Sequence, residues 1–468
     1  MDLSSLTISE ASRLIRTKQI SPVELTQAYL ERIDKINPLL NCFITITPEI
    51  AMQQARQVEK TISNWSKNDG LAKPLTGIPI ALKDLYDTQG IRTTAGSSFF
   101  RDYIPEKDAQ TVKKLKQAGA ILLGKLNLHE IALGVTNVNP HYGACRNPWD
   151  LSRVSGGSSG GSAVAIAADL CLGSLGSDSG GSIRIPASLC GVTGLKPTYG
   201  RVSLRGVFPL SWNTDHAGPM AKNVRDTATL LQVIAGYDPQ DPYSIKHQRV
   251  NYLNNIQNGI SGWRVALASD RYLDKTDPQV WQAIKNAAAV FDQLGGMVET
   301  VEFPGMYEAA LANSLMVPSD AAAFYRGRLA EHPEGFGEDV LRRLTTGAAF
   351  TSSEYILARR TQTLLRRQFE HFFDQYDLLI LPATPVTAPL IEGPDAVEQA
   401  RLLTRYTAPF NLTGLPALTV PCGFTSAGLP VGLQIVARPW SEAKLIQAGY
   451  AFEQATQWQN RKPTIEKT

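Results

Sequence analysis

The chain has 468 residues, of which 43% are hydrophobic and 19% charged, and its formal net charge is +3. This amount of apolar material supports a large buried core and excludes a disordered protein. The near balance of positive and negative charge argues against an extended surface for nucleic acid or anionic lipid. No segment is apolar for long enough to span a bilayer, and the first residues lack the apolar stretch of a secretory signal.

The five cysteines are far apart and show no CxxC spacing, which is typical of small buried hydrophobic residues rather than of metal ligands or disulfides. They are Cys42, Cys145, Cys171, Cys190 and Cys422. Such usage favours a reducing compartment, so we expect a cytoplasmic protein.

The first 65 residues have a helical pattern. Ser21-Pro22-Val23-Glu24 is a capping box with proline at the first helical position, and it predicts a helix that ends at Pro38. A second helix is expected over residues 48–62. The short apolar run at residues 77–82 then predicts a buried strand.

Further along the chain, helices alternate with strands. We expect a helix at 108–118 and a strand at 121–124, followed by a glycine- and serine-rich segment at 151–206. Its glycines are interleaved with apolar stretches, so it is a packed region and not a linker. Strands are expected at 264–268, 298–303 and 378–381, helices at 278–294 and 442–455, and a surface loop at 238–262. The pattern predicts an α/β protein whose mixed sheet is covered by helices on both faces.

Three motifs resemble known sites but lack an essential part. Gly119 to Lys125 resembles a phosphate-binding loop, but Leu126 follows where magnesium binding needs Ser or Thr. His129-Glu130 begins like a zinc-binding helix, but Leu133 replaces the second histidine. Residues 157–161 fit the GxSxG pattern of α/β-hydrolases, but residues 147–155 before them read as a loop, whereas that motif needs a strand.

Lys83 ends the apolar run at 77–82. Most lysines are solvated, and that ordinary role is the default here as well. However, a lysine at the end of a buried strand is costly unless it is paired or neutral. Burial lowers the pKa of a lysine, and a neutral lysine can act as a general base.

Two serine-glycine clusters follow, at residues 156–162 and 178–182. Acyl transfer needs a nucleophile, a base and donors for the developing oxyanion. Tight Gly-Gly turns let successive backbone N–H groups point into one concavity. Taken separately, each cluster is also explained as an anion-binding nest or a tight turn.

Together these segments resemble the amidase signature family. The segments GIPIALKD, SGGSSGGSA, GSDSGGSIRIPASLCGVTGLKPTYGR and HAGP occur in the family's order and spacing, and the strong match covers about residues 70–225. The later segments TAPFNLTGLPALTVPCGF and LPVGLQIVARPW are also similar. The resemblance implies the amidase signature fold as a single domain over residues 1–468, with the helical segment 1–65 packed on the core.

The resemblance also implies a Ser–cis-Ser–Lys triad that needs no metal or organic cofactor. Ser182 would be the nucleophile, Ser158 the bridging serine after a cis peptide bond, and Lys83 the base. Backbone N–H groups of the 179–182 loop would form the oxyanion hole, and three further residues would steady the loop or the lysine. These oxyanion-hole residues are Ser179, Gly180 and Gly181 together with Ser182, and the supporting residues are Ser177, Asp178 and Arg184.

Two functions share this core. The first is a stand-alone hydrolase of a small carboxamide, without direct nucleic-acid or membrane contact and compatible with a homodimer. The second is the glutaminase (A) subunit of a tRNA-dependent amidotransferase, which works with partner subunits. Those subunits typically carry a tyrosine-rich stretch where this chain has residues 353–359, and an acidic residue where it has Thr404. A buried ammonium without a carboxylate binds poorly, so we expect the stand-alone amidase.

Residues that shape the substrate site are harder to identify. Arg343 could pair with a substrate carboxylate, although a surface helix charge explains it equally well. Four residues flank the core and could line the pocket or simply pack: His141, Tyr142, Phe208 and Trp212.

Overall fold

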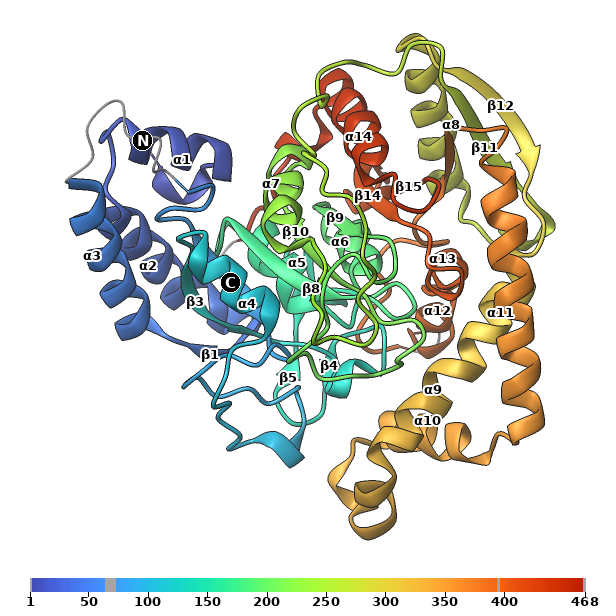
Figure 1. Cartoon of the computed structure of the whole chain (residues 1–468), viewed down its shortest axis with the longest axis horizontal. Coiled ribbons are helices and arrows are strands. Elements are labelled where there is room, and N and C mark those ends of the chain that lie inside the picture. The colour runs from blue at the N-terminus through green and yellow to red at the C-terminus, as the bar shows by residue number, and fades with distance from the viewer. Residues whose placement is uncertain (1, 64–72, 394–395, 466–468) are drawn as a thin grey trace.

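The structure is a computed structural model that describes residues 2–63, 73–393 and 396–465 (Figure 1). Within these residues eleven strands form one mixed sheet in the order β1-β3-β2-β8-β10-β9-β14-β15-β13-β11-β12. The strands are β1 Phe43–Ile46, β2 Pro79–Lys83, β3 Ile121–Leu126, β8 Gly173–Ser177, β9 Thr193–Lys196, β10 Ala217–Ala221, β11 Arg264–Ser269, β12 Met297–Glu302, β13 Leu378–Pro382, β14 Ala417–Phe424 and β15 Pro430–Val436. The expected mixed α/β sheet is therefore confirmed.

Strand β2 lies in the interior of this sheet. It runs parallel to β3 on one side and to β8 on the other, and all five of its residues are buried. Parallel strands buried on both faces read as continuous apolar runs, which is why residues 77–82 stand out in the sequence. This position carries Lys83 into the core of the molecule.

Helices cover both faces of the sheet (Figure 1). They are α1 Ile8–Arg16, α2 Pro22–Leu40, α3 Pro48–Ser63, α4 Gln110–Gln117, α5 Gly160–Ala167, α6 Arg184–Cys190, α7 Val224–Ile234, α8 Pro278–Gln293, α9 Met306–Glu331, α10 Glu338–Ala349, α11 Ser352–Phe372, α12 Ala396–Leu402, α13 Ala408–Leu412 and α14 Glu442–Thr456. None of the helices in the described ranges is long and apolar enough to cross a bilayer.

The N-terminal segment differs in two ways from the expectation. The capping box at Ser21 and Glu24 forms as predicted, but the helix continues beyond Pro38 to Leu40. Pro38 lies in the last turn and has no N–H to donate to the carbonyl of Asp34, so the helix loses one hydrogen bond there. Asn41 then ends the helix in a left-handed conformation. In addition, residues 1–65 are not all helical, because β1 pairs antiparallel with β3 at the edge of the sheet.

Two other local predictions were wrong in part. Residues 147–155 are not a loop, because β7 (Asp150–Val154) pairs with β6 (Arg146–Asn147) in a small separate hairpin. Likewise, the 238–262 segment has no helix or strand, but it is not wholly on the surface. Tyr252, Ile256 and Ile260 in it are buried against the main core.

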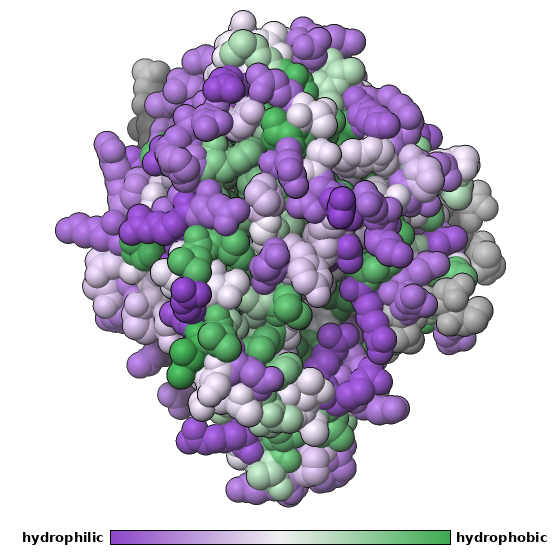
Figure 2. Space-filling view, turned by 90° about the vertical axis from the view of Figure 1, so that its right-hand side faces the viewer, coloured by the Kyte–Doolittle hydropathy of each residue, from purple (hydrophilic) through white to green (hydrophobic). Residues whose placement is uncertain are grey.

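The long helices α9 and α11 lie side by side on the right of Figure 1, with α10 below them. They belong to a second hydrophobic cluster that includes Met316, Leu365 and Phe410. The face of the molecule on this side shows small apolar groups separated by hydrophilic ones (Figure 2). The inner side of α9 and α10 borders the site described next.

Candidate active site

Lys83 ends β2 and is fully buried. Its ammonium nitrogen donates to three serine hydroxyls, Oγ of Ser158 at 2.7 Å, of Ser177 at 2.8 Å and of Ser159 at 3.0 Å. The structure therefore places two of the expected residues, Ser158 and Ser177, directly on Lys83. It also adds Ser159, which the sequence analysis did not single out.

Two other buried lysines show how unusual these surroundings are. Lys125 lies 3.1 Å from the carboxylate of Asp84, and Lys196 donates to the carbonyl oxygens of Pro197 and Leu415. Among the residues described here, the hydrogen-bond partners of the Lys83 Nζ are hydroxyls alone. Burial lowers the pKa of Lys83 to about 7, although the carboxylates of Asp178 and Asp215 act in the opposite direction.

The two serine-glycine clusters meet beside this lysine. The peptide bond between Gly157 and Ser158 is cis, and α5 begins two residues later. The backbone N–H of Ser159 donates to the carbonyl oxygen of Ser182 at 3.2 Å. The first cluster, which contacts Lys83, is thus joined to the second, which carries Ser182.

The loop 178–182 is anchored through its carbonyl groups. The carbonyl of Asp178 accepts from the Asn411 side chain at 2.9 Å, that of Ser179 from the Asn313 side chain at 3.1 Å, and that of Gly180 from the Thr407 hydroxyl at 2.7 Å. The carbonyl of Gly181 accepts from the backbone of Ile185 at 2.7 Å.

This anchoring decides where the loop's donors point. In a trans peptide unit the N–H points away from the carbonyl of the preceding residue. The N–H groups of residues 179–182 therefore face away from the four anchors, and none of them donates a hydrogen bond within the described ranges. A row of unpaired backbone donors beside a serine hydroxyl has the form of an oxyanion hole.

Asp178 and Arg184 fasten the start of the loop to the sheet. Arg184 is fully buried, and its guanidinium contacts both oxygens of Asp178 at 2.9 and 3.0 Å. It also donates to the side chains of Asn411 and Gln434. Burial alone would raise the pKa of Asp178, but the Arg184 guanidinium holds it below its ordinary value. Asp178 is therefore a fixed negative charge next to the loop.

Asp215 is a further site residue that the sequence analysis missed. Its carboxylate accepts from the Ser179 hydroxyl at 2.5 Å and from the backbone N–H groups of Leu210 and Ser211. Burial raises the pKa of Asp215 to about 6, against the effect of these hydrogen bonds. The only sequence indication was its position directly before the HAGP segment. Thr407 opens the family-like segment TAPFNLTGLPALTVPCGF, but the resemblance assigned it no role. Asn313 gave no indication, because it contacts the loop from far along the chain.

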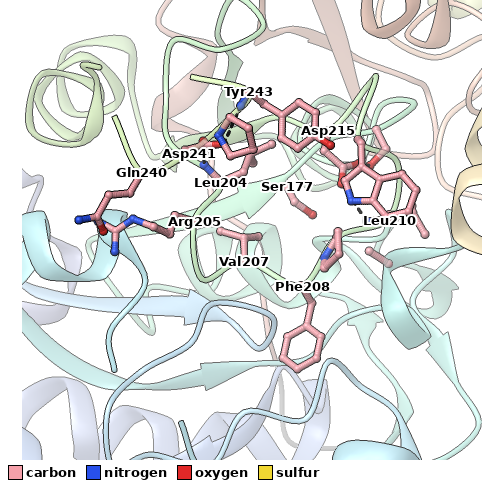
Figure 3. Close-up of a pocket in the computed structure, with 15 residues that line it drawn as sticks. Ser177, Leu204, Arg205, Val207, Phe208, Leu210, Asp215, Gln240, Asp241 and Tyr243 are labelled. Carbon is pink, nitrogen blue, oxygen red and sulfur yellow. Dashed lines mark hydrogen bonds between the residues drawn. The ribbon is translucent and has the colours of Figure 1, made fainter. Parts of the chain in front are cut away.

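Two cavities adjoin the loop. The larger, of about 630 Å³, is lined by Ser179, Gly180 and Ser182 and also by Arg343, so the arginine and the expected nucleophile border the same cavity. The smaller, of about 220 Å³, is bounded by Ser177, Asp215 and Phe208 (Figure 3) and also by Trp212. His141 and Tyr142 line neither of them. His141 instead bonds the buried carboxylate of Glu130.

Comparison with known proteins identifies a family. The Amidase family model matches residues 24–446. The A subunit of glutamyl-tRNA(Gln) amidotransferase from Geobacter sp. (strain M21) is 39% identical, over 99% of this chain and 100% of its own.

Solved structures agree as well. One, described as "An unexpected vestigial protein complex reveals the evolutionary origins of an s-triazine catabolic enzyme", superimposes with a TM-score of 0.91 at 34% identity, over 96% of this chain and 98% of its own. The A subunit of the glutamyl-tRNA(Gln) amidotransferase from Thermotoga maritima gives 0.85 at 34% identity, over 100% and 99%. The chain belongs to the amidase signature family of hydrolases that act on carbon–nitrogen bonds.

Proposed function

We propose that this protein hydrolyses a carboxamide through an acyl-enzyme on Ser182, with Ser158 and Lys83 as its proton relay. The observation that carries the proposal is the buried Lys83, whose nitrogen lies 2.7 Å from the Ser158 hydroxyl and has only hydroxyl partners among the described residues. A lysine with no carboxylate partner and a pKa of about 7 is neutral in a large fraction of molecules at neutral pH.

The reaction has two halves. In the first, neutral Lys83 accepts a proton from Ser158 while Ser158 accepts one from Ser182, and the Ser182 oxygen attacks the amide carbon. The N–H groups of residues 179–182 stabilise the oxyanion. The carbon–nitrogen bond then breaks, and the relay returns a proton to the leaving amine. In the second half, water attacks the acyl-enzyme by the same relay and releases the acid and free Ser182.

Two candidate functions would use this chemistry: a glutaminase subunit of an amidotransferase and a stand-alone amidase. The relatives at 39% identity are named as subunits of an amidotransferase, and this favours the glutaminase subunit over the stand-alone amidase that we expected from the sequence. In that setting the protein would pass ammonia to partner subunits.

One observation favours the self-contained hydrolase instead. Among the residues that the structure describes, no Asp or Glu lines the cavity next to Ser182, and Thr404 is one of the lining residues. Glutamine carries an ammonium group, and an ammonium that loses water without gaining a carboxylate is bound poorly. We therefore keep the stand-alone amidase as the alternative to the glutaminase subunit.

The test is ammonia release by the purified protein alone, across small carboxamides and glutamine, with Ser182→Ala as control. Ammonia that disappears in the variant supports hydrolysis at Ser182 without partners. If every amide is inert while a serine-reactive probe labels wild type and not the variant, the subunit setting is favoured. If the probe labels wild type and Ser182→Ala equally, the assignment of the nucleophile is wrong.

A further inference from the structure

The cavity beside Ser182 is cationic. Arginines from three separate stretches line it: Arg342 and Arg343 on α10, Arg401 on α12, and Arg405 just before α13. Within the described ranges 2–63, 73–393 and 396–465, no acidic side chain lines it. At about 630 Å³ it has the size of a small-molecule site.

These guanidinium groups are poorly neutralised by the residues that the structure describes. The Nε of Arg343 is buried and has no hydrogen-bond partner. Its nearest carboxylate, Asp339, lies 4.0 Å away and already accepts from His129 at 2.9 Å. A buried donor without an acceptor is costly, and a bound ligand is one way to satisfy it. The Arg343 side chain as a whole is 42% exposed and can reach such a ligand.

The neighbouring arginines add to this positive field. Arg405 donates to the carbonyl oxygen of Tyr272 and stacks on its ring at 3.7 Å, so it is held in place without a carboxylate. Arg342 and Arg401 form no ion pair with any described residue. Burial lowers the pKa of Arg343, Asp339 opposes this, and repulsion from Arg342 and Arg401 adds to it.

We propose that the substrate is an amide whose acyl part carries a carboxylate and no ammonium group, with Arg343 as the principal carboxylate partner. This inference rests on the proposed hydrolysis at Ser182. A carboxylate would give the Arg343 Nε its missing acceptor through a charge-assisted hydrogen bond. An ammonium group in the same cavity would meet four arginines and only neutral oxygens.

Three amides with the same five-carbon skeleton test whether the site favours a substrate carboxylate and disfavours an ammonium group. Glutaramate, the monoamide of glutaric acid, has the carboxylate alone, glutamine has the carboxylate and an ammonium, and pentanamide has neither. We expect kcat/KM for glutaramate to exceed that for each of the other two by about tenfold or more, because one charge-assisted hydrogen bond has roughly that effect on affinity.

Variants of Arg343 test whether this residue binds the substrate carboxylate. Arg343→Gln should lower kcat/KM for glutaramate about tenfold to a hundredfold, mainly through KM, and should lower it much less for pentanamide, which has no carboxylate. Arg343→Lys should restore part of the loss. The matched control is Arg360→Gln, which removes an exposed arginine of α11 that does not line the cavity and should change neither substrate.

The outcomes keep the two proposals apart. If pentanamide or glutamine is hydrolysed as well as glutaramate, in a reaction that Ser182→Ala abolishes, hydrolysis at Ser182 stands and the carboxylate inference is overturned. If no amide gives Ser182-dependent ammonia, calorimetric titration of Ser182→Ala with glutaramate decides the inference separately. Binding that Arg343→Gln removes supports it, and the absence of binding overturns it.

Discussion

Lys83 shows how one residue's surroundings can set a reaction's pH dependence. Because burial depresses its pKa to about 7, the neutral form is populated above that pH and lost below it. We therefore expect kcat/KM to rise with pH, to be half-maximal near pH 7, and to fall about tenfold for each unit further into acid. A pH–rate profile of the purified enzyme measures this. A profile that stays flat to pH 5 would show that another group is the base.

Gly181 has a backbone conformation and close neighbours that only glycine accommodates. Its φ of +138° lies in a region that suits glycine, and an added Cβ would collide with the hydroxyl of Thr407 and with Ile185. We expect Gly181→Ala to reduce kcat about a hundredfold by displacing the N–H donors of the proposed oxyanion hole. Steady-state kinetics gives the effect, and circular dichroism checks that the variant is folded. Gly428→Ala, at a surface turn with open space around it, is the matched control.

At the scale of elements, the loop 178–182 depends on helices that are distant in sequence. Thr407, directly before α13, holds the Gly180 carbonyl. Thr407→Val keeps the shape and removes this bond, so one donor of the hole becomes less well aimed. We expect kcat to fall about tenfold with little change in KM, and Thr407→Ser to recover most of the loss. If Thr407→Val raised KM alone, the side chain would be acting on substrate binding instead.

The same elements show what a sequence can and cannot predict. Strand β2 and its terminal Lys83 were predictable, because a buried strand leaves a continuous apolar run and a lysine at its end breaks that run. Asn313 was not, because its contact with Ser179 joins residues 134 positions apart and no local pattern records such a pairing. Helix α9 escaped prediction for a local reason. Helix α9 has no marked apolar face and contains Pro318, so its periodicity is weak.

At the scale of the whole molecule, Glu130 joins the core to the helix that carries Arg343. Its buried carboxylate accepts from Ser97, from His141 and from the backbone N–H of Gly337, just before α10. Glu130→Ala leaves these donors unpaired, so we expect the free energy of unfolding to drop by about 3 kcal/mol. We also expect KM to rise for a substrate held by Arg343.

Thermal unfolding and steady-state kinetics measure the two effects of Glu130→Ala. The control is Glu334→Ala, which removes an exposed acid that pairs only with exposed His332 and should leave the melting temperature unchanged. Equal melting temperatures for the two variants would contradict the anchoring role. A lower melting temperature with an unchanged KM would separate stability from the placement of α10.

The anchoring of the loop 178–182 also bears on how the protein is made. Its carbonyls are held by side chains at positions 313, 407 and 411, which leave the ribosome long after the serine and lysine positions do. A nascent chain that has folded only its first half therefore has the reactive groups without the geometry that aims them. Under the proposed function, we expect a growing polypeptide to gain amidase activity only after the residues at 407 and 411 have been made and folded.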